Sequence, residues 1–201
     1  MYVRAFTTFT AALGCLVPSA YPDIRTFIHD EGYSALLTER EVFEANAAKR
    51  GVSIPVISKP SLNPVEENDA KSSITVELKQ GLHPACYEYA NWMMSCVSDD
   101  HENVISFATL LLLLWGIEKC YYEAFLFVKE SAKFTSLDLS VKNFVEWWTA
   151  PEFRNYINKL EGIFERVQKD EVTWDLHAAR ALFKVMLIYE SQFWNSTISR
   201  V

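Results

Sequence analysis

The sequence has little positive charge and no basic run. It holds 19 lysines and arginines against 26 aspartates and glutamates, so its formal net charge is −7 at pH 7. Nucleic-acid binding needs a cationic stripe that displaces counterions from phosphates, and adhesion to an anionic membrane needs basic residues for the same electrostatic reason. The sequence therefore predicts neither nucleic acid nor a membrane surface as a partner.

Cysteine, histidine and glycine are too few or too scattered for several kinds of site. No histidine follows a glutamate by three residues, so the ligands of a di-iron helical bundle are missing and we expect no metal site. The six glycines form no phosphate-binding loop, and nothing resembles a nucleophile elbow. The absence of a CxxC pair predicts reduced thiols and not a disulfide framework for the four cysteines, Cys15, Cys86, Cys96 and Cys120.

Long hydrophobic runs are missing as well. The apolar run 104–117, interrupted by Ser106, is shorter than the ~20 residues that a membrane span needs. The N-terminal segment resembles a signal peptide superficially, but three threonines interrupt it and Phe6, Phe9 and Leu13 share one helical face. We therefore expect this segment to be a helix of the fold and the protein to be cytoplasmic.

Apolar and aromatic residues are abundant, at 50% and 14% of the chain. This composition is typical of a globular protein, and the length fits a single domain over residues 1–201. Residues 53–83, with three prolines, predict a loop insertion, in which a short strand over 73–78 is an alternative. The predicted fold class is all-α, a helical bundle, because apolar residues recur at helical spacing over residues 2–17, 23–50, 84–96, 102–129, 141–148, 152–168 and 174–197.

Prolines, glycines and capping residues mark several helix boundaries. Pro18 should end the first helix, and Gly51 should end the second. Gly32 should bend or divide the second helix. Asp170 or Thr173 should cap the last helix.

Glu118 is the first candidate catalytic residue. It follows the apolar string FATLLLLLWGI, so its carboxyl should be at least partly buried. Desolvation would raise its pKa towards neutrality, which suits a general acid or base. The alternative is a salt bridge to a lysine on another helix, or a tilt that brings Glu118 to the surface.

Glu190 is the second candidate. It lies in ALFKVMLIYESQFW, where Phe193 and Trp194 are its neighbours at i+3 and i+4 on the same helical face. A carboxylate framed by two rings can grip a ring nitrogen while the rings stack on the ligand. The alternative is a solvated glutamate on a polar face. We expect Glu118 and Glu190 to face one cavity from two helices.

Several strings in the second half of the chain resemble one family. The strings are HPACYEYANWMMS, WWTAPEFRNY and YESQFW, in order and with family-like spacing. They resemble the TenA family, in which a Tyr-Glu-x-x-Phe-Trp pattern supplies an active-site glutamate. The resemblance implies pocket positions for Tyr89 and for Trp148, which stands where many members carry a tyrosine.

The central helix resembles one class within that family. Many members carry a Pro-Cys pair whose cysteine is the nucleophile, whereas this chain reads WGIEKCYYEAF. Ile117 stands near the place of that cysteine and Glu118 follows it. This resembles the class that lacks the cysteine and uses a glutamate. Cys120 is displaced by about one helical step, so it is a weak candidate for the nucleophile.

The resemblance implies a haem-oxygenase-like helical bundle and a role in thiamin salvage. It implies hydrolysis of aminomethylpyrimidine to hydroxymethylpyrimidine, and deformylation of the N-formyl amine in the glutamate class. It implies no metal or organic cofactor, an aminopyrimidine as the small-molecule partner, and a homo-oligomer, either dimer or tetramer. Glu118 would activate water or shuttle the leaving group's proton, and Glu190 would bind and protonate the pyrimidine. The resemblance assigns the ring pocket and its polar contacts to Tyr89, Trp148 and Phe193, with Tyr2 and Tyr121.

The start of the chain departs from the family pattern. MYVRAFTTF resembles the second half of Gln-Asp-Tyr-x-Tyr-x-x-x-Phe, with Tyr2 at the later tyrosine. The aspartate that contacts the aminopyrimidine would precede Met1, as would a first helix. A shortened gene prediction, a truncated chain or a non-catalytic descendant would each explain this. If that helix belongs to the protein, Phe6, Phe9, Leu13 or their neighbours should face an open groove.

Two other functions remain open on the sequence. The missing aspartate favours a non-catalytic protein of the same fold that holds a pyrimidine or another flat ligand. Apolar surface left uncovered by a missing helix would instead make a partner-binding site.

Overall fold

The computed structural model describes residues 2–49, 51, 83–98, 105–172 and 174–198. The first helix, α1, spans Tyr2–Leu16 and ends two residues before Pro18, as expected. The prediction that Phe6, Phe9 and Leu13 face an open groove is wrong, because all three are buried in the core. Helices α3, α5 and α6 and the turn at 28–33 pack against α1 and cover this face.

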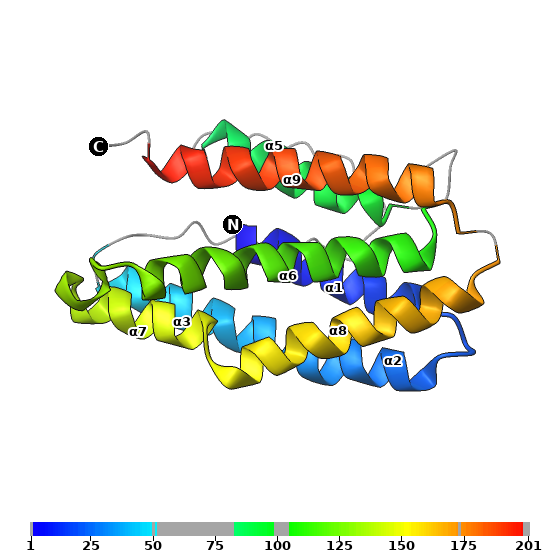
Figure 1. Ribbon diagram of the computed structural model, residues 1–201, viewed down its shortest axis with the longest axis horizontal. Coiled ribbons are helices and arrows are strands. Elements are labelled where there is room, and N and C mark those ends of the chain that lie inside the picture. The colour runs from blue at the N-terminus through cyan, green and yellow to red at the C-terminus, as the bar shows by residue number, and fades with distance from the viewer. Residues whose placement is uncertain (1, 50, 52–82, 99–104, 173, 199–201) are drawn as a thin grey trace, which may run out of the picture.

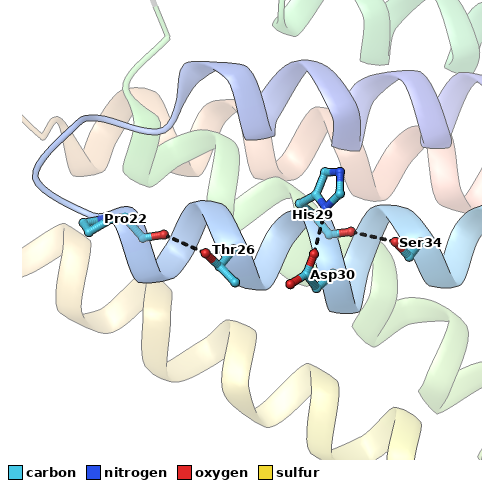
Figure 2. A network of polar contacts seen from close by, with 5 residues as sticks. All are labelled: Pro22, Thr26, His29, Asp30 and Ser34. Carbon is cyan, nitrogen blue, oxygen red and sulfur yellow. Dashed lines mark hydrogen bonds and ion pairs between the residues drawn. The ribbon is translucent and has the colours of Figure 1, made fainter.

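The second predicted helix is continuous but changes its winding. Helix α2 (Pro22–Phe27) runs into a π-helical turn (Ile28–Tyr33) and then into α3 (Ser34–Lys49). The carbonyl of His29 accepts both the backbone N–H of Ser34 and its hydroxyl, at 3.1 Å for the hydroxyl, which is the i−5 spacing of a π turn (Figure 2). Gly32 therefore lies in a wider turn and does not divide the helix.

Residues 52–82, which hold the predicted strand and nearly all of the predicted loop, lie outside the described residues. The next two helices each begin at a side-chain cap. Helix α5 (Pro84–Cys96) starts at a proline, and the Nδ1 atom of His83 accepts the Ala85 N–H at 3.3 Å. Helix α6 (Phe107–Glu130) starts five residues later than predicted, because Ser106 caps it by accepting the Thr109 N–H at 3.2 Å. It is the longest helix of those described.

The C-terminal part contains a short 3₁₀ turn (Phe134–Ser136) and helices α7 (Leu139–Trp148), α8 (Pro151–Asp170) and α9 (Leu176–Ile198). The prediction that Asp170 caps α9 is wrong. Asp170 is the last residue of α8 and accepts the Tyr21 hydroxyl at 3.2 Å. Asp175 caps α9 instead, accepting the His177 and Ala178 N–H groups at 2.7 and 3.2 Å.

The helices form one bundle with α6 at its centre (Figure 1). Helices α5 and α9 lie side by side along one edge, and α7 and α8 lie with α2 and α3 along the opposite edge. Because α1, α7, α8 and α9 all contact α6, its apolar stretch is buried on nearly all sides. The predicted all-α class is confirmed, and no strand occurs within the described residues.

Gly51 has φ of +67°, the left-handed conformation expected of a glycine that ends a helix. None of the helices in the described parts of the chain is long and apolar enough to cross a membrane.

Candidate active site

Glu118 lies in the middle of α6 and is only 4% exposed. It forms no ion pair with any lysine or arginine of the described residues, so the predicted alternatives of a salt bridge or an exposed position do not apply. Burial holds the pKa of its carboxyl well above the ordinary value, and the charges of Glu39 and Glu190 add to the rise. Glu118 is therefore protonated more readily than an exposed glutamate, which suits it to donate a proton to a ligand.

Glu39 on α3 is a second buried carboxyl, which the sequence analysis missed. Its side chain is 7% exposed, and burial raises its pKa to about 8. The signal in the sequence is its spacing, since Glu39 occupies i+3 from the buried Leu36 and i−4 from Phe43. The charged residues that follow Glu39, Arg40 and Glu41, concealed this inward position.

A cavity of about 480 Å³ opens beside both carboxyls. Four glutamates and no lysine or arginine line it, which gives the cavity an acidic character. The lining residues come from the π turn, α3, α6, α7 and the start of α8: Glu31, Gly32, Ala35, Leu36, Glu39, Glu118, Trp147, Trp148, Ala150, Glu152, Phe153 and Tyr156. Of the predicted site residues, this lining includes Glu118 and Trp148.

Aromatic rings form one wall of the cavity. Trp148 meets Phe153 edge to face, with ring centroids 5.0 Å apart, and Phe153 stacks on Tyr156 at 6.3 Å. Trp148 is 8% exposed, and its buried indole N–H has no hydrogen-bond partner among the described residues. Such a wall suits a flat ligand, and the free N–H offers it a donor.

Tyr156 stands between Glu118 and the π turn. Its buried hydroxyl lies near enough to the Glu118 carboxyl to counteract part of the rise in the pKa of Glu118, although it makes no hydrogen bond of good geometry. A Cβ atom on Gly32 would approach this hydroxyl to 3.1 Å. Glycine at this turn therefore lets Tyr156 reach the cavity. Tyr156 is the last residue of the string WWTAPEFRNY, but no role was predicted for it from the sequence.

Glu190 is also buried, at 3% exposed, so the alternative of a solvated glutamate is wrong. Its environment differs from that of Glu118. The Tyr89 hydroxyl donates to Oε1 at 2.6 Å, and the Trp194 indole N–H donates to Oε2 at 3.0 Å. Tyr89 is itself fixed by stacking on Tyr189, at 5.5 Å and an interplanar angle of 4°. Both oxygens of Glu190 are thus held by donors from the protein.

The described cavity contains only one of the two predicted catalytic carboxyls, so the expectation that Glu118 and Glu190 face one cavity stays a prediction. The lining contains neither Glu190 nor three of the predicted contact residues, Tyr89, Tyr121 and Phe193. The physical reason is a layer of packed rings. Tyr121 contacts Trp148 at 5.1 Å and Trp194 at 5.3 Å, so ring contacts run from the cavity wall to the Glu190 hydrogen bonds. The two carboxyls nevertheless interact, because the charge of Glu190 raises the pKa of Glu118.

The remaining candidate residues are Tyr2, Cys120 and Phe193. The side chain of Tyr2 lies outside the described side chains. Burial, then the charges of Glu190 and Glu123, raise the pKa of the Cys120 thiol to about 12, so this thiol is a poor nucleophile near neutral pH. Phe193 lies 6.3 Å from the Tyr121 ring, within the aromatic layer. Among the described residues no three histidine, cysteine, aspartate or glutamate side chains are grouped to hold a metal ion.

The fold is the haem-oxygenase-like helical bundle, as predicted. A solved structure of similar fold is the X-ray structure of a TenA homologue from Pyrococcus furiosus, with a TM-score of 0.71. The likeness covers 96% of this chain and 77% of that chain, at 23% sequence identity. No protein-family model and no curated protein matches the sequence.

Proposed function

We propose that the protein is a TenA-like hydrolase of aminomethylpyrimidine and its N-formyl derivative, with a role in thiamin salvage in the cytoplasm. The observation that carries the proposal is the buried carboxyl of Glu118, which has no cation beside it among the described residues and lines a cavity walled by aromatic rings. The similar fold of a TenA homologue and the sequence patterns around Tyr89, Trp148 and Glu190 support the same family.

Glu118 acts as a general acid and then as a general base. The exocyclic amine nitrogen becomes an ammonium by taking the proton of the neutral Glu118 carboxyl, and ammonia leaves as the C–N bond of this ammonium breaks. The resulting carboxylate takes a proton from the water whose oxygen bonds to the exocyclic carbon, which regenerates the acid. The raised pKa of Glu118 suits this cycle, because it brings the carboxyl closer to the pH range in which a group both gives and takes protons efficiently.

Deformylation uses the same groups in the same balance. Water adds to the formyl carbon, the amide C–N bond breaks, and the proton from Glu118 goes to the departing amine. Formate and aminomethylpyrimidine are the products. The free Trp148 N–H is a donor on the cavity wall for the carbonyl oxygen of this substrate.

Glu190 binds a pyrimidine ring nitrogen in this proposal and donates or shares a proton with it. It does so by exchanging the Tyr89 or Trp194 hydrogen bond for one to the ligand, with Tyr121 and Phe193 moving as the ring enters. Tyr89 and Tyr2 supply polar contacts. The proposed assembly is a homo-oligomer, a dimer or a tetramer.

A second candidate is a binding protein of the same fold that does not turn its ligand over. The observation that favours it is the engagement of both Glu190 oxygens by protein donors, outside the lining of the cavity. Such a protein would hold the pyrimidine in the cavity without protonating it.

Incubation of the purified protein with each pyrimidine separates the two candidates. The hydrolase should release hydroxymethylpyrimidine and ammonia from the amine, or formate from the N-formyl amine, as measured by chromatography. Tight binding of either compound without product would establish the binding protein and overturn the hydrolase.

A further inference from the structure

The cavity contains two carboxyls that no cation of the described structure neutralises. Glu39 and Glu118 are each more than nine-tenths buried and both line it. Within the described residues, no hydrogen bond joins them and no lysine or arginine pairs with either. Buried carboxyls without a partner cost stability, and folds retain them where a ligand or a reaction uses them.

The charged groups around the pair offer it no cation. Glu31, on the π turn, forms an ion pair with Lys159 at 2.7 Å, so that lysine is already engaged at the rim. Arg40 is next to Glu39 in the chain but turns towards Glu44, at 3.5 Å. The other titratable groups at the cavity are acidic or phenolic, namely Glu152 and Tyr156 of α8. Glu190, on α9, adds negative charge behind Glu118.

A polar atom of the wall points to the same conclusion independently of the acidic pair. The Trp148 indole N–H is buried and has no hydrogen-bond partner among the described residues. Trp148 lines the cavity. Buried donors are almost always paired in a complete structure, so this unpaired donor marks the place of a ligand or water.

We propose that Glu39 is a ligand-binding residue, which together with Glu118 holds the protonated amine of a planar heteroaromatic ligand between α3, α6, α7 and α8. An ammonium group has three donors and one positive charge, which match two carboxyls that share one proton. The flat ring packs against Trp148 and Phe153, where the edge-to-face wall leaves room for it. The choice of ligand rests on the proposed function, whereas the preference for a cation over its neutral analogue does not.

Proton release distinguishes this arrangement from a buried pair that only shapes the core. In the free protein the pKa of Glu39 lies at about 8, so at pH 7 its carboxyl is mostly protonated. A bound ammonium lowers that pKa, and a proton leaves to the buffer. Binding of the cation should therefore release protons, while binding of a neutral analogue should release none.

The experiment compares aminomethylpyrimidine with hydroxymethylpyrimidine, which carries an uncharged hydroxyl in place of the amine. Binding is measured by tryptophan fluorescence within seconds of mixing, and proton release by calorimetry in buffers of different ionisation enthalpy. The variants are Glu39→Gln, Glu39→Asp and, as the control on the same helix, Glu41→Gln, an exposed residue. Thermal melting checks that each variant folds.

The wild type should bind the amine more tightly than the alcohol and release a proton only with the amine. Glu39→Gln should weaken binding of the amine by ~10–100-fold, the worth of one charged hydrogen bond, while the affinity for the alcohol changes by less than about threefold. The number of protons released on binding of the amine should fall in the same variant. Glu39→Asp should restore part of the preference, and Glu41→Gln should match the wild type.

An unchanged preference and unchanged proton release in a folded Glu39→Gln variant would overturn the assignment. So would a Glu39-dependent response to Mg²⁺ or Mn²⁺ in place of the amine. If the amine is bound with the predicted preference but never hydrolysed, the proposed hydrolase fails and the binding role of Glu39 stands.

Discussion

Glu190 and the pair Glu39–Glu118 are equally buried, yet their surroundings are opposite. Glu190 accepts a hydrogen bond on each oxygen, from Tyr89 at 2.6 Å and from Trp194 at 3.0 Å. In the part of the chain that the structure describes, Glu39 and Glu118 have neither a cation nor a hydrogen-bond donor of good geometry, and a cavity of about 480 Å³ lies beside them. Burial alone therefore does not identify a reactive carboxyl in this fold. The presence or absence of protein partners divides the carboxyls into one that is held and two that are open to a ligand.

The largest effect should come from Glu118→Gln. Loss of one general acid–base group lowers turnover of the pyrimidine substrates by ~10²–10⁴-fold. The variant should melt no lower than the wild type, because an unpaired buried carboxyl costs stability and an amide costs less. Steady-state turnover together with thermal melting measures both. Glu123→Gln, an exposed position on the same helix that pairs with Lys119, is the control and should retain activity. Near wild-type turnover in Glu118→Gln would place the chemistry elsewhere.

Glu190→Gln should have the opposite effect on stability. An amide retains the size of the side chain, but its NH₂ group must face one of the two donors that now point at Glu190. One buried hydrogen bond is lost, at a cost of about 1–3 kcal/mol in the free energy of unfolding. Denaturant unfolding measures this cost, and Tyr89→Phe should reproduce part of it. Glu190→Gln as stable as the wild type would remove the distinction drawn between the two regions.

The pH dependence of stability should report on Glu39. The folded state holds its pKa at about 8, above the ordinary value of 4.5. Between these two values the unfolded chain has lost the proton and the folded chain has kept it, so stability falls as the pH rises from 4.5 to 8. For one proton the limiting slope is about 1.4 kcal/mol per pH unit. Glu39→Gln should flatten the slope across this range, in denaturant titrations at successive pH values. An identical pH dependence in that variant would show that Glu39 ionises freely.

The smallest effect should come from Cys120→Ala. Burial and two neighbouring carboxylates raise the pKa of its thiol to about 12, so almost no thiolate exists near neutral pH. Turnover should remain within about threefold of the wild type, since no step of the proposed reaction uses the thiol. An inactive but folded variant would move the nucleophile to this cysteine and set the glutamate chemistry aside.

The helical architecture could be predicted because each helix carries a local signal. Apolar residues recur with a spacing of about 3.6 residues, and helix ends are marked by Pro18, Pro84 and Gly51. These signals placed the helices within a few residues of their observed ends. The N-terminal caps were less predictable. Several residues could cap α9, and only the structure shows that Asp175 does so and Asp170 does not.

The burial of Glu118 followed from its neighbours in sequence, but what surrounds a buried group is set by distant segments. Trp194 lies four residues from Glu190 and was visible as its neighbour, whereas Tyr89 lies 101 residues away. Glu39 was overlooked because the charged residues Arg40 and Glu41 follow it on α3 and conceal its inward position. The prediction of an open groove at Phe6 and Phe9 was wrong because helices distant in the sequence cover that face.

A crystal structure of the protein with aminomethylpyrimidine tests the central claim most directly, because it shows where the ligand lies. The account predicts the ring in the cavity against Trp148 and Phe153, with its amine within about 3 Å of both Glu118 and Glu39. A ring bound elsewhere, with the cavity empty and these two carboxyls without a ligand, would contradict it.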